Sequence, residues 1–251
     1  MAASSTNEQP IIEIRDMHKS FGKNHVLRGF NLTLHRGENV VVLGRSGCGK
    51  SVLIKCIVGL IPYDRGSLKV FGKEVSEMSI RELDEVRAKI GFVFQSSALY
   101  DSMTVGENLA FPLQRTKKEL SWGEIKDRVF HYLEQVGLPE KLNTMPSELS
   151  GGQRKRIGVA RTIITEPACL LYDEPTTGLD PQTTREISEL ILHLRDNLKI
   201  TGMVVTHDPY CLKIVSDNVA YIEDGVIAFE GTLEEARRSN HEFLQTFFSL
   251  D

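Results

Sequence analysis

Short apolar runs alternate with longer amphipathic segments along most of the chain. The apolar runs have strand length and are nearly continuous, which is typical of strands covered on both faces of a parallel sheet. We expect strands at residues 11–14, 26–34, 39–43, 68–71, 90–94, 168–173, 203–206, 219–222 and 226–229. Helices are expected at about residues 50–60, 181–196, 209–216 and 232–249. Strands separated by helices predict an α/β fold with a mainly parallel sheet.

The middle of the chain departs from this alternation, because residues from about 96 to 165 are mostly helical in pattern. Ser79 with Glu82, and Ser121 with Glu124, have the spacing of capping boxes that open helices. We expect an α-helical subdomain inserted into the sheet-bearing core, and an antiparallel β subdomain near the N-terminus. Residues 1–9 are small and polar and are expected to be disordered, which leaves a single domain at residues 10–251.

Composition narrows the class of protein. Of the 251 residues, 41% are hydrophobic and 25% are charged, enough for a sizeable core. The formal charge of -4 does not favour nucleic acid as a partner. No stretch reaches the roughly 20 apolar residues of a membrane-spanning helix, so a membrane role would act through other chains. The four cysteines have no paired spacing that would indicate a zinc site or a disulfide framework; they are Cys48, Cys56, Cys169 and Cys211. We therefore expect a reduced, cytosolic location.

A glycine-rich segment after the expected strand at 39–43 carries the clearest chemistry. It matches GxxxxGK[ST] at every fixed position and reads Gly44-Arg45-Ser46-Gly47-Cys48-Gly49-Lys50-Ser51. Glycines let successive N–H groups form an anion nest, and the dipole of the following helix adds to it. Lys50 can bridge β- and γ-phosphate oxygens, and the Ser51 hydroxyl can bind Mg²⁺. The alternative, a glycine-rich turn that binds no ligand, is disfavoured, because the preceding strand, the following helix and the final Lys-Ser all match the phosphate-binding motif. The segment predicts a P-loop NTPase core.

An acidic pair follows a second apolar strand. Asp173 comes at the carboxyl end of this strand, where ligands bind in open α/β sheets. We expect Asp173 to hold Mg²⁺ through water, as a Walker B aspartate does, and Glu174 to polarise the attacking water. Adjacent acidic residues are usually solvated surface, so the prediction depends on the apolar strand and on the phosphate loop upstream.

The segment Leu149-Ser150-Gly151-Gly152-Gln153 reads LSGGQ, and on it the chain resembles the ABC ATPases over nearly its whole length. The resemblance implies that Gln95 contacts the nucleotide and metal and links them to a transport domain, and that His207 contacts the γ-phosphate. It also implies that Phe21 stacks on adenine with Val26 beside it. Taken alone, His207 would be an ordinary histidine and Phe21 a core aromatic.

The same resemblance implies a site divided between two chains. Ser150, Gly151 and Gly152 begin a helix, so their N–H groups and the helix dipole can receive a γ-phosphate. In the family that phosphate belongs to the other subunit, and Asp180 is expected at the dimer contact. We therefore expect a homodimer that binds ATP and Mg²⁺, with Glu174, His207 and Lys50 as the catalytic residues, and an isolated monomer that is nearly inactive.

Three classes of ABC protein compete. Translation-type proteins usually carry two cassettes in one chain, and chromosome-type proteins separate the phosphate loop from the signature by a long coiled coil. This chain has one cassette and no sustained heptads. We therefore expect a transporter's ATPase subunit, bound to an integral membrane permease at the cytoplasmic face of the inner membrane.

The cargo is predicted from two further segments. Residues 92–113 and 171–181 resemble the Mla/Mce-type phospholipid-transport ATPases, although Gln153 stands where many of those proteins have Met. This resemblance implies phospholipid transport between bacterial membranes, with an MCE-type lipid-binding partner and a small regulatory subunit. The alternatives are a polar amino acid or lipoprotein release as the transporter's task.

Three local features leave alternatives open or predict reactivity. An apolar set after Gln95 can be subdomain core or a groove for a permease helix; it comprises Leu99, Tyr100, Met103, Val105, Leu109 and Phe111. An apolar stripe near the C-terminus can pack on its own domain, which we favour, or on a partner; it comprises Phe243, Leu244, Phe247, Phe248 and Leu250. The amides of the phosphate loop and Lys50 are expected to favour the Cys48 thiolate, so that alkylation there blocks hydrolysis.

Overall fold

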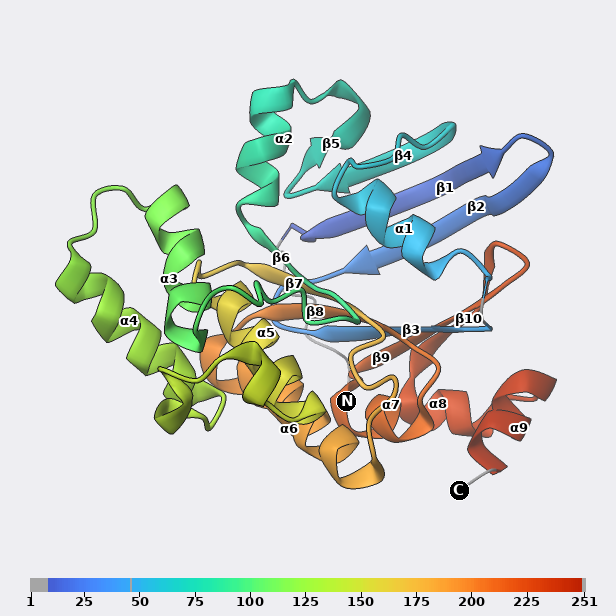
Figure 1. The fold of residues 1–251 in the computed structure, drawn as a ribbon. Helices are drawn as coiled ribbons and strands as arrows, with labels where there is room; N and C mark the ends of the chain where they lie inside the picture. Colours follow the sequence, from blue (N-terminus) through green and yellow to red (C-terminus); the bar gives the residue numbers. More distant parts are fainter. Residues whose placement is uncertain (1–8, 46, 250–251) are drawn as a thin grey trace.

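The computed structural model describes residues 9–45 and 47–249, and its strands form two sheets (Figure 1). The larger sheet has six strands in the order β10-β9-β3-β8-β7-β6. Every neighbouring pair in it is parallel except β9 with β10. Its strands are β3 (Asn39–Gly44), β6 (Ile90–Val93), β7 (Cys169–Asp173), β8 (Thr201–Thr206), β9 (Asn218–Glu223) and β10 (Val226–Thr232). The predicted α/β class with a mainly parallel sheet is confirmed.

The smaller sheet is antiparallel and holds the N-terminal strands in the order β2-β1-β4-β5. These strands are β1 (Ile12–Phe21), β2 (Asn24–Leu34), β4 (Arg65–Val70) and β5 (Lys73–Glu74). The antiparallel β subdomain is therefore confirmed, but β1 is longer than the predicted run at 11–14. Its second half is polar and contains register shifts after Ile14, so its sequence lacks the regular alternation that marks a strand.

The helices occupy both faces of the larger sheet, as the pattern predicted. Helix α1 packs between the two sheets, whereas α5, α6 and α7 cover the opposite face (Figure 1). The central strand β3 serves both layers, because Val41 and Leu43 face one core and Val40 and Val42 face the other. These helices are α1 (Lys50–Ile57), α5 (Gly151–Ile163), α6 (Pro181–Leu198) and α7 (Pro209–Val215).

The helices between the two halves of the core lie to one side of the larger sheet (Figure 1). They are α3 (Val105–Thr116) and α4 (Trp122–Gln135), which pack with α5. Capping boxes begin α2 (Ile80–Arg87) at Ser79 and α4 at Ser121, as the spacing predicted. Three short 3₁₀ turns occupy Val75–Glu77, Pro139–Lys141 and Pro146–Glu148. None of the described helices is long and apolar enough to cross a membrane.

The C-terminal segment differs from the single helix predicted at 232–249. It forms α8 (Leu233–Arg238) and α9 (Glu242–Ser249), separated where Ser239 adopts an extended conformation. The polar residues Ser239, Asn240 and His241 lie at this break, and the described members of the apolar stripe all lie within α9. Leu244 and Phe247 of α9 are buried, and Phe243 and Phe248 pack against the same core. The tail thus packs on its own chain; Leu250 and the predicted disorder of residues 1–8 lie outside the described residues.

Candidate functional site

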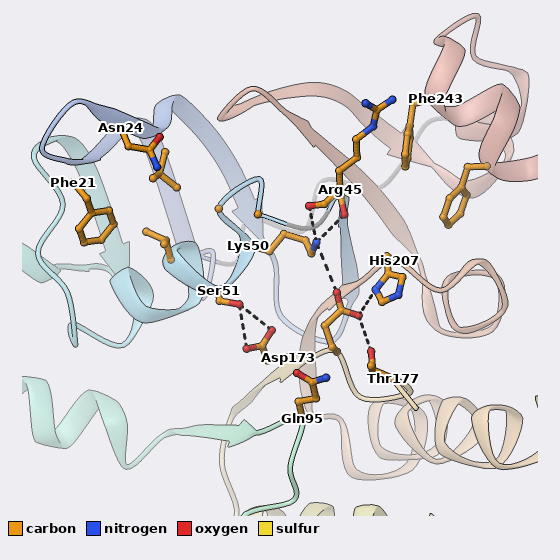
Figure 2. Close-up of a pocket in the computed structure, with 17 residues that line it drawn as sticks. Phe21, Asn24, Arg45, Lys50, Ser51, Gln95, Asp173, Thr177, His207 and Phe243 are labelled. Atoms are coloured by element: carbon orange, nitrogen blue, oxygen red, sulfur yellow. Dashed lines mark hydrogen bonds and ion pairs between the residues drawn. The ribbon is translucent and has the colours of Figure 1, made fainter. Parts of the chain in front are cut away.

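A cavity of about 900 Å³ opens where the carboxyl ends of the parallel strands meet the antiparallel sheet and α9 (Figure 2). The pairing of Leu43 with Thr206, and of Asp173 with Val205, aligns the ends of β3, β8 and β7. The loops that leave these strands therefore deliver their side chains to one place. The lining residues are Phe21, Asn24, Val26, Gly44, Arg45, Gly47, Gly49, Lys50, Ser51, Val52, Gln95, Asp173, Glu174, Thr177, His207, Phe243 and Phe247.

The loop between β3 and α1 has a backbone that larger residues would not tolerate. Gly47 and Gly49 have φ of 82° and 106°, in the left-handed region. A Cβ on Gly49 would lie 2.8 Å from a methyl carbon of Val26, and a Cβ on Gly44 would lie 2.4 Å from the Cys48 sulfur. The glycines therefore give the loop its curvature and leave room on its inner side. Ser46, also predicted to bind nucleotide, lies outside the described residues.

Lys50 is the most enclosed cation of this loop. Its side chain is buried, and Nζ donates hydrogen bonds to the carbonyl oxygens of Gly44 at 2.7 Å and Arg45 at 3.1 Å. The same nitrogen lies 3.7 Å from a Glu174 carboxylate oxygen. The ammonium is thereby held inside the loop, aimed at the space where an anion nest would place phosphate oxygens.

Glu174 stands at the centre of a small polar network. Its carboxylate accepts hydrogen bonds from His207 Nδ1 at 2.8 Å and from the Thr177 hydroxyl at 3.2 Å (Figure 2). Its φ of 51° is left-handed, and its amide donates to the Val205 carbonyl at 2.9 Å. The carboxylate is 16% exposed and the His207 side chain 63% exposed. A carboxylate fixed on three sides and open to a cavity can accept a proton from water there.

Asp173 and Ser51 face each other on the next part of the wall. The Ser51 hydroxyl oxygen lies 3.4 Å from each Asp173 carboxylate oxygen. Burial raises the pKa of Asp173, and the neighbouring Glu174 charge raises it further, against the lowering by the Ser51 hydroxyl. Figure 2 shows Gln95 beside Asp173. Hydroxyl, carboxylate and amide oxygens are the donors that Mg²⁺ takes when substrate phosphates complete its shell.

Phe21 and Val26 line the end of the cavity nearest the antiparallel sheet. Phe21 is 48% exposed, so it is not the core aromatic that one interpretation of the sequence allowed. Asn24, the first residue of β2, also lines the cavity and was not predicted from the sequence. An exposed ring and an aliphatic side chain at a cavity's edge suit the face of a base; stacking on adenine stays a prediction.

The signature segment lies elsewhere. Ser150 is the N-cap of α5, bonded to the Gln153 amide at 3.2 Å, and Asp180 is the N-cap of α6, bonded to the Thr183 amide at 3.0 Å. None of Ser150, Gly151, Gly152 and Asp180 is among the described residues that line this chain's cavity. Ser150 and Gly151 are exposed, whereas Gly152 is buried beside Thr183 of α6. These residues therefore do not contribute to the cavity of the same chain.

The prediction for Cys48 is wrong in direction. Burial raises the pKa of its thiol, and this outweighs the lowering by the Lys50 charge and by the amides of Lys50 and Cys48. The Lys50 ammonium is directed to the carbonyls of Gly44 and Arg45 instead. The sequence places the cation near the sulfur but does not reveal how much water the packed loop excludes.

Some residues of the apolar set after Gln95 fit the interpretation as subdomain core, and others fit the interpretation as a groove. Val105 and Leu109 are fully buried, and Leu99 packs partly against the same core. Tyr100 is 41% exposed, with its ring 5.2 Å from that of Phe111. The buried members are subdomain core, and the exposed Tyr100 with the partly buried Phe111 beside it remains for a groove.

Several residues of the cavity wall were not predicted from the sequence. Thr177 lies close to Asp173 and Glu174 in the sequence, and this proximity was the available signal that it belongs to the site. Phe243 and Phe247 were recognised as an apolar stripe, but nothing local indicates that the stripe reaches the phosphate loop.

Known proteins are similar to this chain over most of its length. Residues 27–177 match the model of a family described as ABC transporter. A methionine import ATP-binding protein, MetN, from Clostridium tetani is 40% identical over 225 residues, covering 90% of this chain and 70% of that protein. MetN from Brucella abortus is 39% identical over 222 residues, and there this chain spans 60% of the relative's length.

Solved structures share the fold. CbiO1 from Clostridium perfringens, part of the ABC transporter complex cbiONQ, superposes with a TM-score of 0.85 at 28% identity, covering 97% of this chain and 99% of that one. A dimeric post-hydrolysis state of the ATP-binding cassette MJ0796 with ADP and Pi has a TM-score of 0.79 at 30% identity, covering 88% of this chain and 98% of the cassette.

Proposed function

Because the chain belongs to the ABC transporter family, we propose that it is one half of a homodimeric motor whose ATP hydrolysis drives a membrane permease. The chain is an ATP hydrolase coupled to transport, and it binds ATP with Mg²⁺. The expected transporter subunit is thereby confirmed. We further propose that residues 10–251 form one ATPase domain with the helical subdomain at about 96–165.

The cavity fits this nucleotide on its own chemistry. Gly44, Gly47 and Gly49 leave the inner side of the loop free, and Lys50 supplies a buried cation. Ser51 and Asp173 present oxygen donors to a hard cation, with Gln95 beside them. The described residues contain no cluster of three or more histidine, cysteine or acidic ligands, as suits an ion held mainly by phosphate oxygens and water. Bound Mg²⁺ would neutralise charge on the phosphates.

Glu174 would act as the base for the attacking water. Its hydrogen bonds from His207 and Thr177 fix the carboxylate, and the Lys50 ammonium lies 3.7 Å from it. His207, largely exposed on the other side of Glu174, is free to turn toward a terminal phosphate while it keeps the carboxylate oriented. Phe21 and Val26 would take the adenine.

The separation of the signature from the cavity is the observation that carries the dimer. The cavity wall bears the cradle, the metal ligands and the base, but none of Ser150, Gly151 and Gly152 is among the described residues that line it. A second copy related by two-fold symmetry would bring its signature to this cavity and receive this chain's signature in return. The dimeric cassette MJ0796, 30% identical, supports the same arrangement.

Mixing two inactive variants tests this arrangement. Lys50→Ala removes the cradle's cation, and Gly151→Asp puts a like charge where a phosphate would bind. A Cβ on Gly151 meets nothing closer than Leu179 at 3.9 Å, so this substitution leaves the packing intact. In a mixed dimer one site has both halves native, so an equimolar mixture should recover up to about a quarter of wild-type ATPase activity. A mixture no more active than either variant alone would contradict the divided site.

The permease is proposed to bind near the exposed Tyr100 and its partly buried neighbour Phe111 on the helical subdomain. This would place the chain at the cytoplasmic face of the inner membrane as a peripheral subunit. Tyr100→Ala should weaken co-purification with the permease and leave ATP binding by the isolated chain unchanged, since Tyr100 is not a cavity residue. Loss of ATP binding, or unchanged co-purification, would argue against this surface.

For the cargo, the named relatives favour the amino-acid alternative, with methionine as the amino acid, over phospholipid. Two of them, 40% and 39% identical, are methionine import proteins. The phospholipid prediction stays as a second candidate on the resemblance of residues 92–113 and 171–181 to the Mla/Mce type alone, because the relatives named above do not support it. The MCE-type partner and the small regulatory subunit belong to that candidate alone.

Stimulation of the purified transporter distinguishes the cargoes. In lipid nanodiscs, ATPase activity that rises with L-methionine and a methionine-binding partner supports the first candidate. Activity that responds instead to phospholipid composition and an MCE-type partner supports the second. A response to neither would reject both cargoes without affecting the ATPase assignment.

A further inference from the structure

Helix α9 contributes an aromatic wall to the nucleotide cavity. Phe243 and Phe247 line it together with the phosphate loop, although they come from the other end of the sequence. Figure 2 shows Phe243 next to Arg45, on the opposite side of the cavity from Phe21. If the base occupies the Phe21 end, α9 lies at the end where the terminal phosphate would be.

The Phe243 ring is fixed relative to the phosphate loop. It stacks on Tyr221 with centroids 4.3 Å apart and planes 8° apart, and it lies 5.7 Å from the Phe247 ring. Tyr221 is fully buried on β9, where it pairs in register with Leu43 of β3, the strand that leads into the loop. Stacked aromatic pairs hold their geometry beyond what apolar burial alone supplies, so the ring is a rigid support.

Arg45 uses this support. Its guanidinium carbon lies 5.8 Å from the centroid of the Phe243 ring, within the range of a cation–π interaction. Its carbonyl accepts hydrogen bonds from Lys50 Nζ at 3.1 Å and from the Cys48 amide at 3.2 Å. The residue whose side chain rests on α9 is thus also the one whose backbone orients the catalytic lysine.

The charged side chains that line the cavity indicate what Arg45 does there. Among the described residues that line the cavity, Lys50 and Arg45 are the lysine and arginine, and Asp173 and Glu174 are the carboxylates. A nucleoside triphosphate with Mg²⁺ adds further negative charge, so each cation contributes strongly to its binding. A guanidinium can also donate paired hydrogen bonds to phosphate oxygens.

We propose that Phe243 is a positioning residue that holds Arg45 at the terminal-phosphate end of the cavity, where Arg45 binds the phosphates and favours ATP over ADP. The inference rests on the proposed placement of the nucleotide in this cavity.

Equilibrium binding of Mg-ADP and a non-hydrolysable Mg-ATP analogue to the full chain tests the proposal. Arg45→Ala should raise the Kd for the analogue about tenfold, the loss expected for a charge-assisted hydrogen bond, and that for ADP no more than about threefold. Phe243→Leu should raise the Kd for the analogue about threefold, in line with a cation–π contact. Phe243→Tyr should restore it, because the ring is kept.

The coupling between the two residues is the decisive readout. In an Arg45→Ala background, Phe243→Leu should have no further effect on the Kd for the analogue. Phe248→Leu, which removes another α9 aromatic that lies outside the cavity, is the matched control and should leave both Kd values unchanged. Thermal unfolding of each variant verifies that it is folded.

Three results would overturn the inference: independent effects of the two substitutions, equal losses for ATP analogue and ADP, or losses in Phe248→Leu as large as those in Phe243→Leu. Lys50→Ala separates this failure from failure of the proposed function. If Lys50→Ala loses the analogue while Arg45→Ala keeps it, only the role of Arg45 and Phe243 fails. If Lys50→Ala also binds normally, the placement of the nucleotide fails.

Discussion

The phosphate loop and the signature segment both begin a helix with glycines, and the structure treats them differently. The phosphate loop is surrounded by Lys50, Asp173 and Glu174 within a cavity. The signature start is capped by its own residues, with Ser150 and Gln153 bonded to each other in both directions, and it is not among the described residues that line that cavity. A helix start therefore becomes a phosphate site through what surrounds it. The loop has its surroundings within one chain, and the signature would acquire them from a second copy.

The largest effect is expected at the base. Glu174→Gln keeps the shape of the side chain and its place beside Lys50 but removes its proton-accepting charge. Hydrolysis should fall by about 10² to 10⁴, the usual contribution of a general base, while ATP binding is retained. Phosphate release and equilibrium ATP binding measure the two halves of this prediction. Hydrolysis at wild-type rate by this variant would remove Glu174 from the role of base.

The next effect tests the curvature of the phosphate loop. Gly49→Ala forces a side chain to φ of 106° and within 2.8 Å of a Val26 methyl carbon. The free energy of unfolding should fall by about 1 to 3 kcal/mol, the cost of a strained backbone position, and ATP affinity should fall as well. Gly151→Ala is the matched control for stability, because its Cβ has room, and it should leave the free energy of unfolding unchanged. Equal effects at the two glycines would show that the two helix starts are not different in this respect.

A smaller effect comes from the charge on Asp173. Its pKa is raised chiefly by burial, so the folded protein holds this proton more tightly than the unfolded chain does. The associated stability is fully present below the ordinary pKa of 3.8 and is lost as pH rises through the folded-state pKa. Without Mg²⁺ and nucleotide, Asp173→Asn should therefore unfold at a higher temperature than the wild type at pH 7, and the difference should shrink near pH 3.

The pKa of Asp180, at the start of α6, is shifted in the opposite direction to that of Asp173, so its effect on stability has the opposite pH dependence. Hydrogen bonds from the Thr183 side chain and amide lower its pKa, so its contribution to stability is present above the ordinary pKa and is lost as pH falls through the lowered one. Asp180→Ala should lower the melting temperature at pH 7. If both aspartate variants shifted the melting temperature in the same direction, burial at Asp173 would not be the dominant influence.

The smallest effect concerns Cys48. Since burial raises the pKa of its thiol, iodoacetamide should label it at pH 7 more slowly than it labels a cysteine in a short peptide, and the rate should rise with pH. Mass spectrometry of the phosphate-loop peptide follows this reaction. Labelling faster than the peptide would restore the reactive thiolate that the sequence predicted.

The sequence predicted the parts of this molecule that are local in the chain. The strand before Gly44, the glycines, the lysine of the loop and the strand that ends at Asp173 each carry their own pattern, and their joint placement follows from a parallel sheet. The capping serines Ser79 and Ser121 were found for the same reason.

Features that depend on tertiary packing were missed. The approach of Phe243 to Arg45 joins segments that are far apart in the sequence. The raised pKa of Cys48 depends on how the folded loop excludes water. Spacing within a segment contains no information about any of these.

The divided site can be tested most directly by the mass of the Glu174→Gln variant in solution with Mg²⁺ and ATP, measured by size-exclusion chromatography with light scattering. The chain has a mass of 28.2 kDa, and this mass should double with ATP and stay single with ADP or without nucleotide. The double variant with Gly151→Asp should bind ATP and remain a monomer. An ATP-bound Glu174→Gln that stays monomeric, or a double variant that still dimerises with ATP, would contradict the account.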